Sequence, residues 1–321
     1  MKSIRRKLTH SVAIAAGVAT LGTALASAQG VQAADQPKVP ANYISKTAPR
    51  DVVDFDQLTW PELYKAIHEQ GKTTIIIFNG GNEQRGPQSI VGGHTIIAHD
   101  TADAIARKLG NALVAPVLPF SPNRADPAKP GTIGISPATF AEINQEVAEQ
   151  LIKNGFKNVV LIGDHGGGQN ELRDVAVKLD AQYAPQGVRV IYSDGPYTQA
   201  NTEFFAWLAQ NGYPASTHAG IPDTSEMLYL QGTTHHYVRK DLLPISLGDP
   251  PRQPGQPFDP NAKRINNGIS GDARRSSAAL GKRFIDLKIK DGVAQIQKLL
   301  SETPQQVADS YPKGNGFRET N

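Results

Sequence analysis

Residues 79–100 read NGGNEQRGPQSIVGGHTIIAHD and follow the apolar run TTIIIF at 73–78. This run joins β-branched and aromatic residues over six positions, which predicts a buried strand. It stops at a pair of glycines, and apolar residues at helical spacing begin at 95. A buried strand that leads through a glycine-rich loop into a helix is typical of an α/β sheet, in which binding sites form beyond the carboxyl ends of the strands.

The same alternation continues on both sides of this stretch. Further strands are predicted at 112–117, 158–162 and 188–192, and helices at 56–70, 95–109, 137–154, 171–183, 202–210 and 281–300. The segment 218–230 begins as a loop and becomes helical, while 120–134 and 247–263 are rich in proline and read as loops. Strands that alternate with helices at this spacing predict a mainly parallel sheet covered on both faces. We expect a single α/β domain at 56–321, preceded by an N-terminal arm at 34–55.

The first 33 residues have the features of a secretory signal peptide. Four basic residues lie within the first seven positions, residues 11–25 are apolar or small, and small residues allow cleavage near Ala28 or Ala33. The apolar run is too short to span a bilayer. The prediction is an exported protein, periplasmic or secreted, that has no membrane segment after cleavage. The Arg5-Arg6 pair weakly suggests the twin-arginine route, and an ordinary basic Sec signal is the preferred interpretation.

Composition narrows the possible functions. The formal net charge of +3 falls to about −1 when the four positive charges of the leader are removed, so no nucleic-acid partner is indicated. The chain has no cysteine, which excludes disulfides, thiolate ligands and cysteine nucleophiles. A bound metal would therefore be held by imidazole or carboxylate groups, which suit zinc or manganese.

Three clusters of polar residues follow predicted strands or precede predicted helices, and they would meet at one edge of the sheet. His165 stands out, because it lies between an aspartate and three glycines directly after the run NVVLI. The other residues have simpler interpretations, such as a surface ion pair between Glu83 and Arg85 or packing of His218 against a loop. The glycines could cradle a phosphate, but the Walker lysine is missing. His99 and Asp100 belong to the first cluster but fall inside a predicted helix, where a solvent-facing position is the simpler interpretation. The clusters are Glu83, Arg85, Gln88, His94, His99 and Asp100; Asp164 and His165; and His218, Asp223 and Glu226.

These clusters resemble motifs of the creatininase family of metal-dependent amidohydrolases. EQRGPQ at 83–88 is similar to the E-Q-H-G-P-H stretch of the family, and GGHT at 92–95 falls where the family has G-T-D-T. PGTI at 130–133 matches directly, and DHGGG at 164–168 resembles G-H-G-G-N. HAG at 218–220 with DTS at 223–225 resembles H-A-G followed by E-T-S, and 268–281 resembles a late G-x-x-G-D segment. The resemblance covers roughly residues 60–300.

The resemblance implies a three-layer α/β/α sandwich with a mainly parallel sheet, one or two divalent metals, and assembly as homo-oligomers, often hexamers. The ligand positions of the family map onto Glu83, Arg85, His94, His165 and Asp223. Two of these depart from the family pattern in a way that matters. Arg85 replaces a histidine ligand, and a guanidinium cannot ligate a metal. His94 replaces an aspartate that bridges two ions.

Three smaller departures concern neighbouring positions. Gln88 replaces a histidine, Gly168 replaces an asparagine, and Asp223 is a shorter carboxylate than the glutamate of the family. We expect one ion per chain rather than two, zinc or manganese, held by Glu83, His94, His165 and Asp223. The remaining assignments from the resemblance are catalytic roles for Asp223, Glu226 and Arg85, and substrate contacts from Gln88, Gly167, Gly168 and His218.

The function that follows is metal-dependent hydrolysis of a C–N bond in a small cyclic or linear amide, as by creatinine amidohydrolase. The alternative is a periplasmic protein that has lost catalysis and binds a small polar ligand, with Arg85 as its anchor. Metal content distinguishes the two, because a binding protein of this kind needs no ion at the sheet edge.

Overall fold

The computed structural model describes residues 39–47, 51–251 and 263–312. The signal peptide at 1–33 and most of the loop 247–263 lie outside the described residues, so the leader remains a prediction. The described residues from Val39 onward form one compact unit. The part of the arm that is described contains two short 3-10 turns, Ala41–Tyr43 and Phe55–Gln57.

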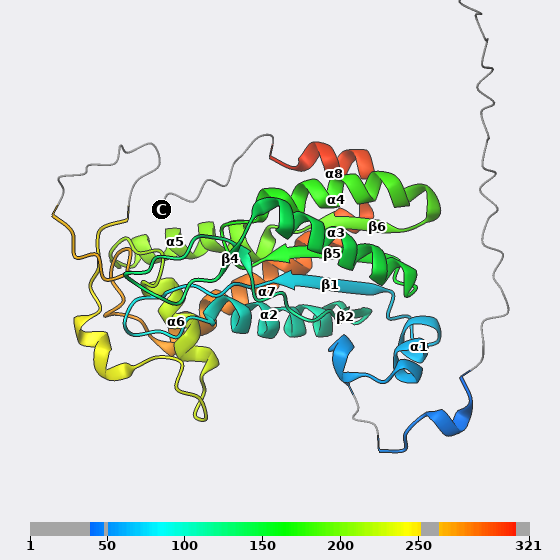
Figure 1. Cartoon of the computed structure of the whole chain (residues 1–321), viewed down its shortest axis with the longest axis horizontal. Helices are drawn as coiled ribbons and strands as arrows, with labels where there is room; N and C mark the ends of the chain where they lie inside the picture. The colour runs from blue at the N-terminus through cyan, green and yellow to red at the C-terminus, as the bar shows by residue number, and fades with distance from the viewer. Residues whose placement is uncertain (1–38, 48–50, 252–262, 313–321) are drawn as a thin grey trace, which may run out of the picture. The chain divides into compact units, whose positions relative to one another are not determined.

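A parallel four-stranded sheet forms the centre of the described structure, in the order β2-β1-β5-β6 (Figure 1). Its strands are β1 (Thr74–Asn79), β2 (Ala112–Val114), β5 (Asn158–Gly163) and β6 (Arg189–Tyr192). In the register of β1 and β5, Asn79 lies opposite Gly163, so the two strands end side by side. The loops that carry the first two polar clusters therefore start from adjacent positions on one edge of the sheet.

Helices cover both faces of this sheet. On one side lie α2 (Gly93–Leu109) and α7 (Ala278–Ser301), and on the other lie α3 (Pro137–Lys153) and α4 (Gln169–Tyr183), with α8 (Pro304–Ser310) next to α4 (Figure 1). Every residue of β1 is buried, as expected for a central parallel strand. The predicted three-layer α/β/α sandwich is confirmed.

The remaining elements lie around this core. They are α1 (Trp60–His68), α5 (Ala200–Gln210), α6 (Ile221–Leu230), and the short parallel pair β3 (Ser121–Pro122) and β4 (Gly134–Ile135). Thr59 is the N-cap of α1 and forms a capping box with Glu62. Phe204 of α5 stacks on Phe284 of α7 with ring centroids 4.3 Å apart, and this contact ties α5 to the long helix.

Several predicted boundaries were wrong. The helix predicted at 56–70 begins only at Trp60, because residues 55–57 form a separate 3-10 turn. The strand predicted at 112–117 ends at Val114, just before Pro116. The helix predicted at 95–109 begins two residues earlier, at Gly93, and this places His94 in its first turn. Helix α8 was not predicted.

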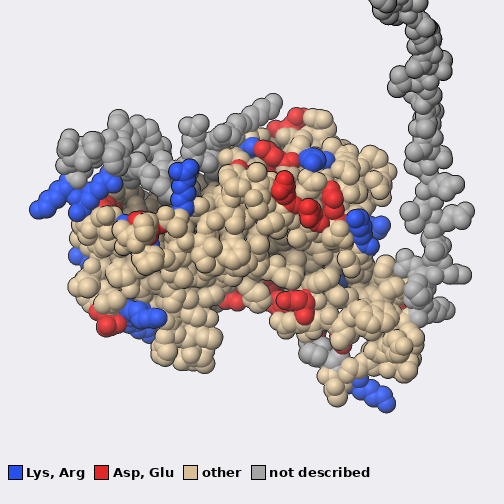
Figure 2. Space-filling view, viewed as in Figure 1, with Lys and Arg blue, Asp and Glu red and all other residues tan. Residues whose placement is uncertain are grey.

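Charged side chains are spread over the visible surface. On the face shown in Figure 2, acidic and basic residues are interspersed among the described residues. Within the described part of the chain, none of the helices has the length and apolar character needed to cross a bilayer.

Candidate metal centre

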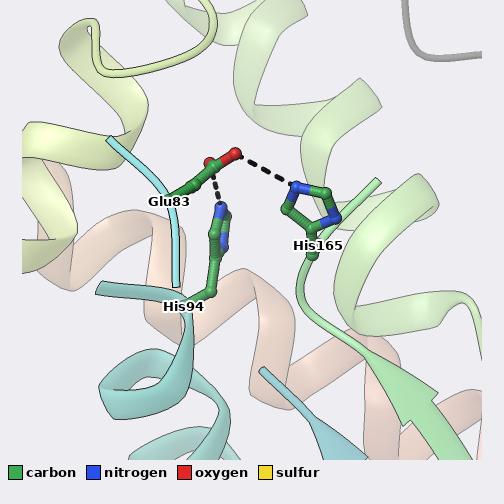
Figure 3. A group of neighbouring side chains, drawn as sticks. All are labelled: Glu83, His94 and His165. Carbon is green, nitrogen blue, oxygen red and sulfur yellow. Dashed lines mark hydrogen bonds and ion pairs between the residues drawn. The ribbon is translucent and has the colours of Figure 1, made fainter. Parts of the chain in front are cut away.

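Three side chains from the first two clusters meet at the carboxyl edge of the sheet (Figure 3). Glu83 comes from the loop after β1, His94 from the first turn of α2, and His165 from the loop after β5. Nε2 of His94 lies 2.8 Å from Oε1 of Glu83, and Nε2 of His165 lies 3.1 Å from Oε2. All three residues are buried, and each offers one ligand atom within 4.8 Å of the others. One carboxylate and two imidazoles gathered in this way form a suitable donor set for a divalent metal.

Close packing of the loop after β1 against α2 fixes where His94 lies. A Cβ atom on Gly80 would be 2.6 Å from Cα of Thr95, the residue that follows His94. Any side chain larger than hydrogen at position 80 would therefore push the first turn of α2 away from the loop. The Gly80 N–H donates to the carbonyl of Leu118, which holds the loop in this position.

A second layer of charged residues lies behind His94. Oδ2 of Asp164 is 2.7 Å from Nδ1 of His94, and Oδ1 accepts a hydrogen bond from Nζ of Lys288 at 2.6 Å. The same ammonium group lies 2.8 Å from Oε1 of Glu226. All four side chains are buried. A buried carboxylate behind a histidine is the arrangement that orients metal-binding imidazoles in proteins.

The pKa values of the two carboxylates that contact Lys288, Asp164 and Glu226, are shifted in opposite directions. Burial alone would raise the pKa of Asp164, but Lys288 and His94 outweigh it, so this pKa lies below its usual range. Burial raises the pKa of Glu226 to about 7, and the nearby Asp164 adds to that effect, while Lys288 opposes it. The Lys288 ammonium sits between the two carboxylates, and their charges raise its pKa despite burial. Asp164 is thus held as an anion and Lys288 as a cation.

His218 and Asn123 complete the surroundings of Glu83. Nδ1 of His218 lies 3.2 Å from Oε1 of Glu83, and the Asn123 amide donates to Oε2 at 3.0 Å. Burial works against charge on both Glu83 and His218, yet their mutual attraction dominates: the pKa of Glu83 lies well below its usual range and that of His218 is raised. Neighbouring imidazoles at His165 and His94 also lower the Glu83 pKa. Glu83 is therefore an anion with cationic or donor groups on both oxygens.

Arg85 and Asp223 form a separate ion pair. Nη2 of Arg85 lies 3.1 Å from Oδ2 of Asp223, and the guanidinium is completely buried. Beyond this ion pair, the three guanidinium nitrogens have no hydrogen-bond partner within the described residues. A Cβ atom on Gly93 would lie 2.5 Å from Nη1, so the glycine provides the space that the guanidinium fills. Burial disfavours its charge, but Asp223, Glu83 and other carboxylates overcome this and raise the pKa of Arg85.

Asp223 lies outside the three-residue metal group. Its Oδ2 accepts the N–H of Ala219 as well as the Arg85 contact. The expected four-residue ligand set is thus divided in the structure: Glu83, His94 and His165 meet, and Asp223 sits with Arg85 at the start of α6.

The residues expected to contact substrate have varied surroundings. Gln88 is fully buried and donates to the carbonyl of Ala219 at 2.6 Å and to Oγ1 of Thr224 at 3.0 Å, so it braces the turn before α6. The Gly167 N–H lies 3.0 Å from Nδ1 of His165. Gly168 is the N-cap of α4, with φ of 101°. Of the expected substrate residues, Gly167 contacts His165 of the metal group and His218 contacts Glu83.

Two residues around the metal group were not singled out from the sequence. Asn123 lies in the proline-rich loop 120–134, where no local pattern marks it. Lys288 carried a signal: it occupies the apolar side of α7, next to buried Ile289 and four residues after buried Phe284. A lysine at a core position of an amphipathic helix is rarely left without a partner.

Comparison with known proteins identifies relatives of this fold. A sequence profile described as Creatininase: Creatinine amidohydrolase matches residues 56–296. The crystal structure of creatinine amidohydrolase (creatininase) is 20% identical with a TM-score of 0.63, covering 78% of this chain and 99% of the other. A structure named creatininase Mn is 20% identical, with a TM-score of 0.61 and coverages of 77% and 98%. A mutant creatininase described as Zn-Zn type is 22% identical, with a TM-score of 0.60 and the same coverages. No curated protein matches the chain.

Proposed function

Because the chain belongs to the creatininase family, we propose that it is a metal-dependent hydrolase of a C–N bond in a small cyclic or linear amide. Family and fold indicate an amidohydrolase type of function. The observation that carries the specific proposal is the buried group of Glu83, His94 and His165. Similar structures are named for manganese and for zinc, which are the ions we propose here.

The charges of the pocket support one divalent ion rather than two. Four carboxylates, Glu83, Asp164, Asp223 and Glu226, face the two permanent cations Arg85 and Lys288. One divalent ion would balance the two remaining negative charges. In the metal-free protein, part of this charge is taken up by protons, since the pKa of His218 is raised and that of Glu226 is about 7. We therefore propose that Glu83, His94 and His165 hold a single ion.

The residues around the ion have distinct proposed roles. When bound, the ion would polarise the amide carbonyl and lower the pKa of a water molecule. The side chains of Asp223 and His218 are 17% and 32% exposed, so they are the titratable groups through which protons can pass to and from a substrate. Arg85 and Glu226 are fully buried, and we assign them to setting the charge of the pocket. The Asn123 amide donates to Glu83 and lies 3.2 Å from Nε2 of His165, and we assign it to holding these two side chains in place.

The test is metal content followed by a substrate screen. Mass spectrometry of the purified protein is expected to give about one divalent ion per chain, lost in Glu83→Ala and His165→Ala because each removes a ligand. His99→Ala is the matched control, since His99 is a half-exposed histidine of α2 that contacts Asp54. A panel of creatinine, small lactams and linear amides, assayed for amine release before and after chelation, then tests the reaction.

Three results would contradict the proposal. A folded protein without metal would favour the alternative, a protein that binds a small polar ligand without catalysis. Metal loss in His99→Ala as severe as in Glu83→Ala would show that the ion is bound elsewhere. An ion count near two would contradict the single-ion site.

Export and assembly are separate proposals. We propose that the protein is exported through its leader and acts in the periplasm or outside the cell, which fractionation of expressing cells would test. We also propose a homo-oligomer, a hexamer by family resemblance, which light scattering of the purified protein would test.

A further inference from the structure

Lys288 is a buried lysine on the core side of α7, with 3% of its surface exposed. Its neighbours along that side, Phe284, Ile285 and Ile289, are buried apolar residues, and its Nζ lies 4.8 Å from the centre of the Phe284 ring. Removing an ammonium from water is costly unless charged partners compensate. The position of Lys288 therefore depends on the groups that its ammonium contacts.

These contacts form a continuous path to the metal group. The ammonium lies 2.8 Å from Oε1 of Glu226 in α6 and donates to Oδ1 of Asp164 at 2.6 Å. The other oxygen of Asp164, Oδ2, lies 2.7 Å from Nδ1 of His94. Nε2 of the same imidazole faces Glu83 at 2.8 Å. Four elements, α6, α7, the end of β5 and the start of α2, are joined in this order.

This path has a direct consequence for His94. With Oδ1 held by Lys288, Asp164 has its Oδ2 fixed toward the imidazole. An ionised carboxylate only accepts hydrogen bonds, so Nδ1 of His94 must carry the proton between them. Nε2 faces Glu83 at 2.8 Å, where it shares a proton with that carboxylate in the metal-free protein, and binding of the proposed ion would displace this proton. Carboxylates in this position fix the ring orientation and the tautomer of metal-binding histidines.

We propose that Lys288 is a positioning residue, which acts through Asp164 to hold His94 with Nδ1 protonated and Nε2 directed at the metal group. Its effect on metal binding rests on the proposed function. The contact with His94, by contrast, exists in the metal-free protein and can be measured there.

The first measurement is zinc affinity by competition with a chromophoric chelator. Lys288→Met, which keeps the length of the apolar stem and removes the charge, is expected to weaken zinc binding about tenfold, the lower end of the range for outer partners of ligands. Lys290→Met is the matched control, because Lys290 lies two residues along the same helix and is 58% exposed, paired with Glu203. In an Asp164→Asn background, Lys288→Met is expected to cause no further loss.

The second measurement is the Nδ1–H proton signal of His94 in the NMR spectrum of the metal-free protein, assigned by its loss in His94→Asn. Wild type and Lys290→Met are expected to show a slowly exchanging downfield signal, and Lys288→Met to lose it. A change in overall stability alone would not remove one histidine signal from a folded protein.

Either readout at its wild-type value in folded Lys288→Met would overturn the proposal. An additive loss of affinity in the double variant would also overturn it, since Lys288 would then act by a route other than Asp164. If the wild-type protein binds neither zinc nor manganese, the proposed function fails, and the His94 signal alone decides the inference. If Lys288→Met does not fold, the double variant Lys288→Met/Glu226→Gln takes its place with the same readouts and Glu226→Gln as its reference, because it leaves one buried carboxylate fewer without a counter-charge.

Discussion

The Glu83–His94–His165 group and the Arg85–Asp223 pair lie at the same edge of the sheet. They differ in the positive charge that can neutralise the carboxylate of each. The first group places a carboxylate among imidazoles, which is a donor set that could hold a metal ion. The second already contains its cation, a completely buried guanidinium 3.1 Å from the carboxylate. The difference supports the proposal that one place for an ion remains in this chain and that a built-in cation stands where a second ion would bind.

The largest effect that tests whether the metal group and the Arg85–Asp223 pair are separate is expected from Arg85→Met. Removing the guanidinium leaves Asp223 without its buried partner, which should lower the free energy of unfolding by about 3–5 kcal/mol. Urea denaturation measures this, and Lys282→Met, which breaks an exposed pair with Asp286, should change it by less than about 1 kcal/mol. Metal content should remain that of wild type. If Arg85→Met keeps its stability and loses its metal, Arg85 takes part in metal binding, and the metal group and the Arg85–Asp223 pair are not separate.

A smaller effect concerns the pH dependence of stability through Glu226. Its pKa is about 7 in the folded protein against an ordinary value of 4.5, so the folded state binds more protons between these values. The free energy of unfolding of the metal-free protein should therefore contain a component that falls as pH rises from about 4.5 to 7, by about 3 kcal/mol. Glu226→Gln removes that component.

The measurement for Glu226 is urea denaturation of the metal-free protein at pH 5, 6, 7 and 8. Relative to wild type, Glu226→Gln should gain stability as pH rises, whereas Glu203→Gln, which alters an exposed contact with Lys290, should follow the wild-type curve. Parallel curves for wild type and Glu226→Gln would mean that Glu226 is ionised in the folded protein throughout this range.

The smallest effect is expected from Gly93→Ala. The added methyl would lie 2.5 Å from Nη1 and 2.7 Å from Cζ of Arg85, so the guanidinium must shift from Asp223. We expect a loss of about 1–3 kcal/mol in the free energy of unfolding, as for other overpacked sites. Ala98→Gly, at a buried position of the same helix, provides a comparison for helix propensity. If Gly93→Ala is as stable as wild type, the Arg85 side chain can move away from position 93 without loss of stability, which contradicts the close packing described here.

The fold could be predicted because its signals are local. The run at 73–78 and its glycine-rich continuation specify a buried strand and a turn toward a helix, and the structure has both in place. Glu83, His94 and His165 could be grouped because adjacent parallel strands end at the same edge, as the pairing of Asn79 with Gly163 shows. The end of a strand and a glycine-rich loop can both be predicted from residues that are neighbours in the sequence.

The pairings within the site were harder to predict, because they join residues far apart in sequence. Asp223 was grouped with the metal ligands from a motif, whereas the structure places its carboxylate on the buried Arg85, 138 positions earlier. Which of several carboxylates contacts Arg85 depends on how α6 packs against the loop after β1. No periodicity of the sequence encodes this packing. Asn123 lies in an irregular loop and shows no pattern. Lys288 could have been noticed, since its charge interrupts an otherwise apolar helix side.

The close approach of Gly80 to Thr95 has a consequence for how the sequence tolerates change. Gly80 carries no functional group, yet a Cβ atom there would lie 2.6 Å from the backbone of the residue after His94. In a mutational scan scored by activity, position 80 should therefore tolerate substitution as poorly as a residue that takes part in the reaction, and even alanine should abolish activity. Intolerance to substitution would then mark where the backbone sets the spacing of the pocket, as well as where a side chain takes part in the reaction.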